Sequence, residues 1–89
     1  MTTHKLKTWS EPFQAMWDGR KKFEFRKNDR DFQEGDILIL REWDPDTTHY
    51  SGRMIIGMVT FIICEGFGIP LGYCIMSLDH MEIFDKTSR

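Results

Sequence analysis

The stretch from Met54 to Met76 places the tightest limit on what this chain can fold into. It is long enough to cross a membrane as a helix, and it carries a single charged residue, Glu65. Its first half, MIIGMVTFIIC, is rich in β-branched residues, and its middle, EGFGIPLG, is punctuated by glycine and proline. Both features favour strands over a helix. The sequence therefore predicts two buried strands joined by a turn, and no transmembrane segment.

A short helix is expected near the start of the chain. Residues 4–9, HKLKTW, alternate like an edge strand and lead to Ser10, a residue type that favours the N-cap position. Gly19 stands where the C-terminal cap of the helix is expected. The residues between them form one apolar face at i, i+3 and i+4, made of Phe13, Met16 and Trp17. A helix this short is stable only when it packs on another element.

After Gly19 the periodicity of the sequence changes from helical to strand-like. Phe23 and Phe25 share one face of this strand and are expected to contact the core. Glu24 and Arg26 share the opposite face. Further strands are expected over residues 37–43, 53–64 and 73–78, with residues 81–84 as an extension of the last.

These elements predict a mainly β (α+β) fold, a small barrel of five to six strands with one short N-terminal helix. Gly57 lies inside a predicted strand and indicates a bulge or bend. Closing a strongly curved sheet into a barrel also removes its unpaired edges. A chain of 89 residues makes a single domain, 1–89, in which we expect residues 1–3 and 86–89 to be flexible.

Charge is unevenly distributed along the chain. The formal net charge is −2, yet residues 1–30 hold eight Lys or Arg against four Asp or Glu, and the remainder holds four against ten. A uniformly basic nucleic-acid-binding protein is therefore excluded. The distribution instead predicts one basic patch on an acidic body.

The cysteines and histidines give no sign of a metal centre or of any other cofactor. Cys64 and Cys74 form no C-x-x-C pair, and His4, His49 and His80 are far apart in the sequence. The first residues lack the apolar run of a signal peptide. We therefore expect a cytoplasmic protein with two free, buried thiols and with neither a metal nor a membrane as partner.

Several motifs resemble those of a known family. Gly19-x-Lys21-x-x-Glu24-x-Arg26 is similar to the G-x-K-x-x-E-x-R signature of ASCH domains, which belong to the PUA-like superfamily of small β-barrels. The pattern F-x-x-G-D-x-L-x-L follows it, from Phe32 to Leu40. The motifs H-x-L-K, RKNDR-x-F, LREWDP and Y-x-G-R most resemble a branch of short, uncharacterised phage and bacterial proteins.

The resemblance implies a PUA-like barrel that binds RNA or a modified nucleoside in a cleft beside the G-x-K-x-x-E strand. One subgroup of the family is an amidohydrolase that acts on acetylated cytidine with a Lys and a Thr from this strand and a Glu farther along. Lys21 matches that Lys, whereas Glu24 stands at the position of the Thr. We therefore expect binding in a basic cleft, with hydrolysis of an acylated cytidine as the alternative and Lys21 and Glu24 as the candidate catalytic residues.

The candidate ligand-binding residues combine basic, hydrogen-bonding and aromatic side chains. Positive charge and polar groups would contact phosphates and base edges, and exposed rings would stack on bases. The candidates are His4, Lys7, Lys21, Glu24, Arg26, Asn28, Arg30, Trp43 and Tyr50.

Structural roles compete with these assignments. The charged residues from Lys21 to Arg26 could be a solvated strand face, Asn28 could cap a turn, and Lys7 could protect an edge strand. Strict alternation also places Lys21 on the face opposite Glu24, unless a bulge or a curl of the chain brings the two together. Trp9 and Trp17 are expected in the core. A third function, binding to a host protein, would use the apolar faces of residues 53–64 as an interface.

Overall fold

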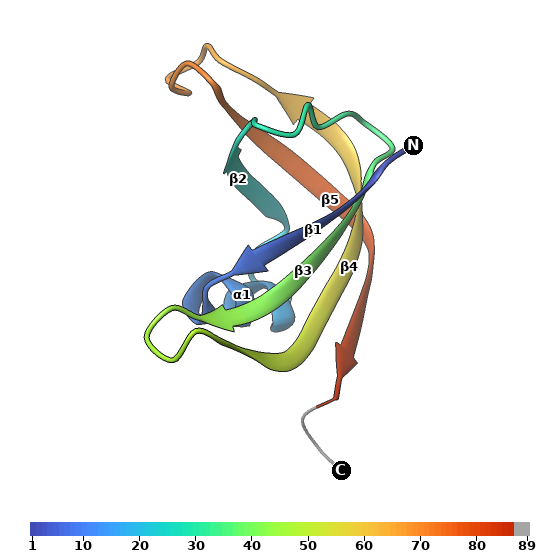
Figure 1. Cartoon of the computed structure of the whole chain (residues 1–89). Helices are drawn as coiled ribbons and strands as arrows, with labels where there is room; N and C mark the ends of the chain where they lie inside the picture. The colour runs from blue at the N-terminus through green and yellow to red at the C-terminus, as the bar shows by residue number, and fades with distance from the viewer. Residues whose placement is uncertain (87–89) are drawn as a thin grey trace.

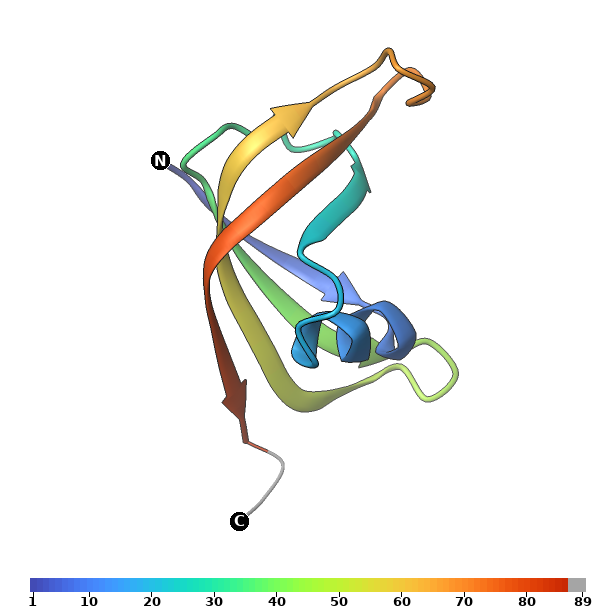
Figure 2. The same cartoon turned by 180° about the vertical axis from the view of Figure 1, so that it is seen from behind.

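Five strands form one sheet that curls into a half-barrel (Figures 1 and 2). In the computed structural model, which describes residues 1–86, the strand order is β1-β3-β4-β5-β2. Strands β1 and β3 run parallel, and the other neighbours are antiparallel. The elements are β1 (Thr3–Thr8), α1 (Ser10–Trp17), β2 (Phe23–Lys27), β3 (Ile37–Asp44), β4 (His49–Ile63) and β5 (Tyr73–Asp85).

The predicted fold class, mainly β with five strands and one short N-terminal helix, is confirmed. Closure of the sheet differs from the expectation, because β1 and β2 end the strand order at opposite edges. Within residues 1–86, the structure holds no helix with the length and apolarity that a membrane crossing requires. Within residues 1–3, which were predicted to be flexible, the Thr2 N–H donates a hydrogen bond to the Asp36 carboxylate. Residues 87–89, part of the C-terminal stretch predicted to be flexible, lie outside the described residues.

Helix α1 lies on the concave side of the curled sheet (Figure 2). Phe13 and Met16 are buried, as their spacing predicts. The helix ends at Trp17, and Gly19 follows the C-cap residue Asp18 with a φ of 81°, a left-handed conformation that glycine adopts without strain. The predicted N-cap is wrong by one residue. Trp9, with extended backbone, occupies that position, and its carbonyl accepts the Phe13 N–H at 3.0 Å.

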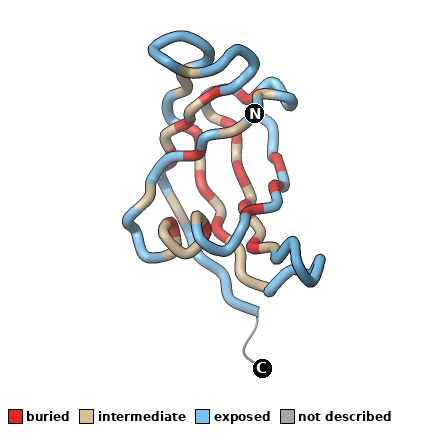
Figure 3. Tube along the Cα trace, turned by 90° about the vertical axis from the view of Figure 1, so that its left-hand side faces the viewer, coloured by how far each residue is buried: buried red, intermediate tan, exposed pale blue. Residues whose placement is uncertain are grey.

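The core is built from alternate residues of the strands, which line the inside of the curl (Figure 3). The largest fully buried side chains are Phe13, Leu38, Leu40, Ile55, Met76, Val59 and Cys74. On β4, Ile55 and Val59 belong to the core, whereas Phe61 is 56% exposed, so binding of a host protein to this strand stays a prediction. Cys74 is buried, which raises the pKa of its thiol, whereas Cys64 is exposed and the prediction of two buried thiols is wrong for it.

Strand β2 has the opposite orientation to the one predicted. Glu24 is 4% exposed and faces inward, whereas Phe23 and Phe25 are 46% and 48% exposed. The inward carboxylate is tolerated because it has two cationic partners, Lys21 and Arg26. Outside, Phe25 stacks on Tyr73 at a centroid distance of 5.6 Å, which covers part of both rings.

The bulge predicted at Gly57 is confirmed. The pairing of β4 with β5 shifts register between Ile56 and Met58, on either side of this glycine. A Cβ atom at Gly57 would lie 3.3 Å from Met81 Cγ and 3.6 Å from Leu78 Cβ. The bulge therefore lets β5 pass closely over β4 where the sheet bends.

A largely buried ion pair, between Arg53 and Glu42, attaches α1 to the sheet. Arg53 of β4 donates to both carboxylate oxygens of Glu42 on β3, at 2.8 and 3.0 Å, and to the Gln14 side chain at 2.8 Å. Its guanidinium also lies 4.6 Å from the ring centroid of Trp17. The hydrogen bonds from Arg53 outweigh the cost of burial and lower the pKa of Glu42. Arg53 thus joins α1, β3 and β4 through one side chain.

Candidate functional site

The two edge strands, β1 and β2, are bridged by arginine side chains instead of a backbone ladder. Arg26 of β2 donates to the Lys7 carbonyl at 2.7 Å, and Arg30 donates to the Lys5 carbonyl at 2.9 Å. Carbonyls of β1 that would otherwise remain unpaired at the sheet edge thereby gain charged donors. The bridged gap between β1 and β2 is called the seam below.

Two adjoining cavities open along the seam, and they share Lys7 and Arg26 as walls. The first has a volume of about 330 Å³ and the second of about 410 Å³. The first cavity is lined by Lys7, Thr8, Trp9, Pro12, Lys21, Glu24, Phe25, Arg26, Lys27 and Tyr73. The second is lined by Lys5, Leu6, Lys7, Arg26, Arg30, Arg41 and Tyr50.

Glu24 is held by one cation on each carboxylate oxygen. Lys21 Nζ lies 3.1 Å from Oε1, and Arg26 Nε lies 2.6 Å from Oε2. Lys21 precedes β2, so strand alternation does not apply to it. Its side chain folds back over the start of β2, where the ammonium donates hydrogen bonds to the Phe23 carbonyl at 2.7 Å and to Glu24. The structure thus brings Lys21, Glu24 and Arg26 together in the wall of the first cavity.

Arg26 connects this cluster to β1. Besides Glu24 and the Lys7 carbonyl, it donates to the Thr8 hydroxyl at 3.1 Å. These bonds use Nε and one terminal nitrogen, and in the described part of the chain they leave the other terminal nitrogen for a ligand. The planar guanidinium can therefore hold the seam and still present donors to the first cavity.

Exposed aromatic rings border the first cavity. Trp9 is 61% exposed, which overturns its expected place in the core, and Tyr73 stacks on Phe25. Neither Trp9, Tyr73 nor Phe25 was among the predicted site residues. A signal for Trp9 was present, because alternation from Leu6 and Thr8 places it on the outward face with Lys5 and Lys7.

The second cavity is strongly basic. Five of its seven lining residues are Lys or Arg, and no acidic residue lines it in the described part of the chain. The Arg41 guanidinium lies 3.7 Å from the ring centroid of Tyr50. Of the predicted residues, Lys7, Arg26, Arg30 and Tyr50 meet here. Trp43 lies outside both cavity linings, with the Lys7 ammonium 4.4 Å from its ring centroid.

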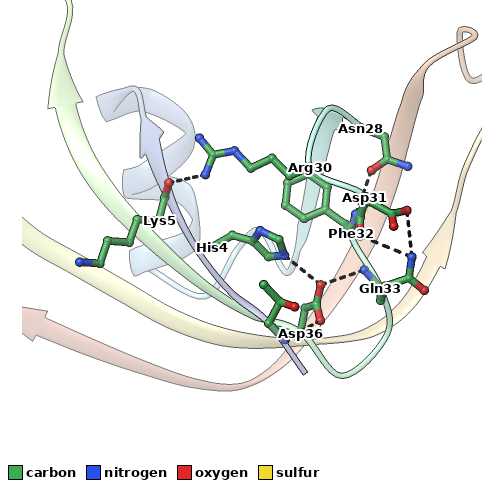
Figure 4. A network of polar contacts seen from close by, with 9 residues as sticks. His4, Lys5, Asn28, Arg30, Asp31, Phe32, Gln33 and Asp36 are labelled. Carbon is green, nitrogen blue, oxygen red and sulfur yellow. Dashed lines mark hydrogen bonds and ion pairs between the residues drawn. The ribbon is translucent and has the colours of Figure 1, made fainter.

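Asn28 has a turn-stabilising role in the structure. Its Oδ1 accepts the Phe32 N–H at 3.0 Å, and its own N–H donates to the Gly72 carbonyl at 2.8 Å (Figure 4). Neither cavity lining includes Asn28. The side chain therefore orders the loop after β2, which carries Arg30 to the seam.

His4 is likewise occupied inside the fold. Its Nε2 lies 2.9 Å from Asp36 Oδ2, and its ring packs edge-on against Phe32 (Figure 4). Burial would raise the pKa of Asp36, but hydrogen bonds from His4 and from the Thr2 and Gln33 N–H groups outweigh it and lower that pKa. His4 lines neither cavity and ties β1 to the start of β3.

We expect Asp36→Asn to flatten the acid end of the stability profile. The lowered pKa means that the Asp36 carboxylate stabilises the fold above about pH 4, and that this contribution is lost as the pH falls further. Urea unfolding between pH 7 and pH 3 should show a shallower loss for the variant than for the wild type. The exposed Asp29→Asn serves as control. Identical profiles for the wild type and Asp36→Asn would contradict the assignment.

The seam concentrates the positive charge of the chain. Among the described residues, seven Lys and Arg side chains line the two cavities, against one acidic residue, Glu24. The basic patch predicted from the charge distribution is therefore present, although Arg41 comes from outside residues 1–30. Among residues 1–86, no group of three or more His, Cys, Asp or Glu side chains is placed to hold a metal ion.

Comparison of the sequence with known proteins shows the family to which this chain belongs. Residues 3–78 match a domain of unknown function, DUF3850. The chain belongs to the DUF3850 family. All residues that line the two cavities fall inside the matched range, so the complete seam is part of the DUF3850 domain.

A curated relative of this DUF3850 domain comes from Escherichia phage P2, the uncharacterized 12.9 kDa protein in the GpA 3′ region. The two sequences are 37% identical over 57 residues, which is 64% of this chain and 50% of the relative. The matched segment thus spans about half the length of the phage protein.

Proposed function

We propose that this DUF3850 domain is an ASCH-type, PUA-like domain that binds RNA or a modified nucleoside in the first cavity of the seam. One observation carries the proposal. A buried Glu24, held by Lys21 and Arg26, lies in the wall of a cavity whose rim bears the exposed rings of Trp9 and Tyr73. Charged donors beside exposed aromatic rings are what recognition of an unstacked base requires.

The chemistry of each wall suggests a division of roles. Trp9 offers a ring on which a base can stack, and Arg26 offers the donors left over from its bonds to Glu24 and β1. Glu24 fixes the guanidinium in place through one charge-assisted hydrogen bond from Arg26 Nε. Lys27 and Lys7 add positive charge at the rim, which attracts phosphates.

Hydrolysis of an acylated cytidine is the second candidate function, because of the Thr8 hydroxyl. Thr8 comes from β1 and lines the same cavity as Lys21 and Glu24, so a threonine hydroxyl is present although Glu24 replaces the one expected on β2. Binding is favoured because both Glu24 oxygens and the Lys21 ammonium already have partners within the protein. Glu24 is the one glutamate that lines this cavity among the described residues, so the Glu farther along the hydrolase sequence has no counterpart here.

We expect short single-stranded RNA to bind at low salt and to be released as the salt concentration rises, because phosphate contacts release counterions. Replacing Lys21, Glu24 and Arg26 together by alanine should weaken binding about tenfold or more, the loss of one to two charge-assisted contacts. Removing Glu24 with its partners avoids leaving a buried carboxylate unpaired. Fluorescence anisotropy of labelled RNA across a salt series measures both effects.

The matched control is Arg20→Ala with Lys22→Ala. These two cations come from the same segment but line neither cavity, and they should leave the affinity within about twofold of the wild type. Equal losses in the control and the triple variant would reject a site at Lys21, Glu24 and Arg26. Release of acetate from acetylated cytidine by the wild type, lost in Thr8→Val, would establish hydrolysis instead of binding.

A further inference from the structure

We infer that the second cavity is a phosphate-binding subsite, occupied by a phosphate attached to the nucleoside that binds in the first cavity. The position of the nucleoside rests on the proposed function, but the affinity of the second cavity for phosphate rests on its own lining. That lining contains five cationic side chains and a tyrosine, with no carboxylate from the described residues.

The absence of a carboxylate distinguishes this cavity from the other cationic sites of the fold. Arg53 is paired with Glu42, and Arg20 with Asp18. Of the five cations that line the second cavity, Arg26 is paired with Glu24, whose carboxylate lines the first cavity. Five cationic residues line the second cavity of a chain whose net charge is negative. Like charges held together in this way repel each other, and a multiply charged anion relieves that repulsion.

The donors are arranged around the cavity from three elements. Lys5 and Lys7 belong to β1, and Arg41 belongs to β3, where the register places it directly beside Lys7. Arg30 comes from the loop after β2 and is fixed by its bond to the Lys5 carbonyl (Figure 4).

Two of the arginines are pre-ordered for an anion. Arg41 lies over the ring of Tyr50, and a stacked guanidinium keeps the N–H groups of its edge for hydrogen bonds. Arg30 uses one terminal nitrogen for β1 and retains its other donors. Such planar donors match the geometry of phosphate oxygens.

The two cavities can hold one ligand, because Lys7 and Arg26 line both. A nucleoside stacked at Trp9 would place its sugar near these shared walls and its phosphate in the second cavity. The phosphate could belong to a free nucleotide or to an RNA backbone, since both offer the same group. The shared chemistry is a nucleoside phosphate, and the source is a matter for experiment.

Inorganic phosphate, followed by NMR, tests the subsite without any nucleoside. We expect phosphate to shift the resonances of Lys5, Lys7, Arg30 and Arg41, with affinity about five- to tenfold lower in Lys5→Gln with Arg41→Gln. The control is Arg20→Gln with Lys22→Gln, which should titrate like the wild type. Absence of shifts at the second cavity, or equal weakening in both double variants, would overturn the inference.

A second set of affinity measurements then separates this inference from the proposed function. The ligands are cytidine and guanosine, their 3′- and 5′-monophosphates, and a trinucleotide. A monophosphate that binds several-fold tighter than its nucleoside, with the gain lost in Lys5→Gln with Arg41→Gln, supports the subsite and a free nucleotide as ligand. The same gain confined to the trinucleotide supports the subsite and an RNA backbone. Nucleoside binding without any gain from phosphate overturns the subsite and leaves the proposed function standing. Phosphate binding without any binding of nucleoside or RNA supports a phosphate site in the second cavity and overturns the proposed function.

Discussion

Replacement of Arg53 by alanine is expected to lower the free energy of unfolding by about 2–4 kcal/mol, slightly less than the cost of removing one partner of a fully buried ion pair, because the Arg53 side chain is 19% exposed. Glu42, only 8% exposed, would keep its charge but lose both hydrogen bonds from its cationic partner, and would retain the one from the Ser51 hydroxyl. The contacts of the guanidinium with Gln14 and the Trp17 ring would also disappear. Since a small domain has a total stability of about 5–15 kcal/mol, this single change should remove a large part of it.

Urea unfolding of Arg53→Ala against Arg41→Ala tests this expectation. Arg41 is one strand away and contacts the exposed ring of Tyr50, so its loss should cost about 1 kcal/mol or less. A double variant, Arg53→Met with Glu42→Leu, should regain much of the loss, because apolar residues of similar size often replace a buried ion pair without penalty. If Arg53→Ala and Arg41→Ala unfold at the same urea concentration, Arg53 does not hold α1 on the sheet.

The strands and the helix could be predicted because their signals are local. Residues 37–43 and 73–78 are mainly apolar and follow turn-forming residues, Gly35–Asp36 and Gly72, and Gly19 stops the helix through its own backbone freedom. The bulge could be predicted because Gly57, a glycine inside a strand, is likewise a local signal. Closure of the barrel was predicted wrongly, because a general tendency to avoid free edges does not say how an edge is satisfied. Here Arg26 and Arg30 bond the β1 carbonyls.

The orientation of β2 could not be read from its sequence. A two-residue period shows that Phe23 and Phe25 share one face and Glu24 and Arg26 the other, but it does not show which face is inside. The hydrophobicity of Phe23 and Phe25 favoured their face as the inner one. The decision lies with groups distant in sequence, since Arg26 also bonds β1, 18 and 19 residues away. A buried carboxylate becomes acceptable only when such partners are in place.

The same reason divides the predicted site residues into two groups. Lys7, Lys21, Glu24, Arg26, Arg30 and Tyr50 line the cavities of the seam. His4 and Asn28 instead bond Asp36 and Phe32, which both lie in the loop between β2 and β3, and Trp43 belongs to neither group. A sequence motif contains residues that contact a ligand and also residues that stabilise a loop. Only the contacts in the structure show which residues belong to which kind.

Trp9→Ala is expected to have the largest effect on RNA binding of any single substitution that leaves the fold intact. A base stacked on an aromatic side chain gains about 1–3 kcal/mol, so the affinity should fall roughly 10- to 100-fold. Trp9 is 61% exposed, so its removal should cost little stability. The anisotropy of labelled RNA gives the affinity, and urea unfolding of the same preparation confirms that the variant is folded.

Phe61→Ala is the matched control for this experiment. Phe61 is 56% exposed on β4 and lines neither cavity, so its loss removes a comparable exposed ring without touching the seam. We expect its affinity for RNA to equal that of the wild type. Trp9→Phe should bind between the wild type and Trp9→Ala, because a smaller ring retains part of the stacking surface. Equal affinities for Trp9→Ala and Phe61→Ala would show that no base stacks at the first cavity, and the proposed mode of binding would then be wrong.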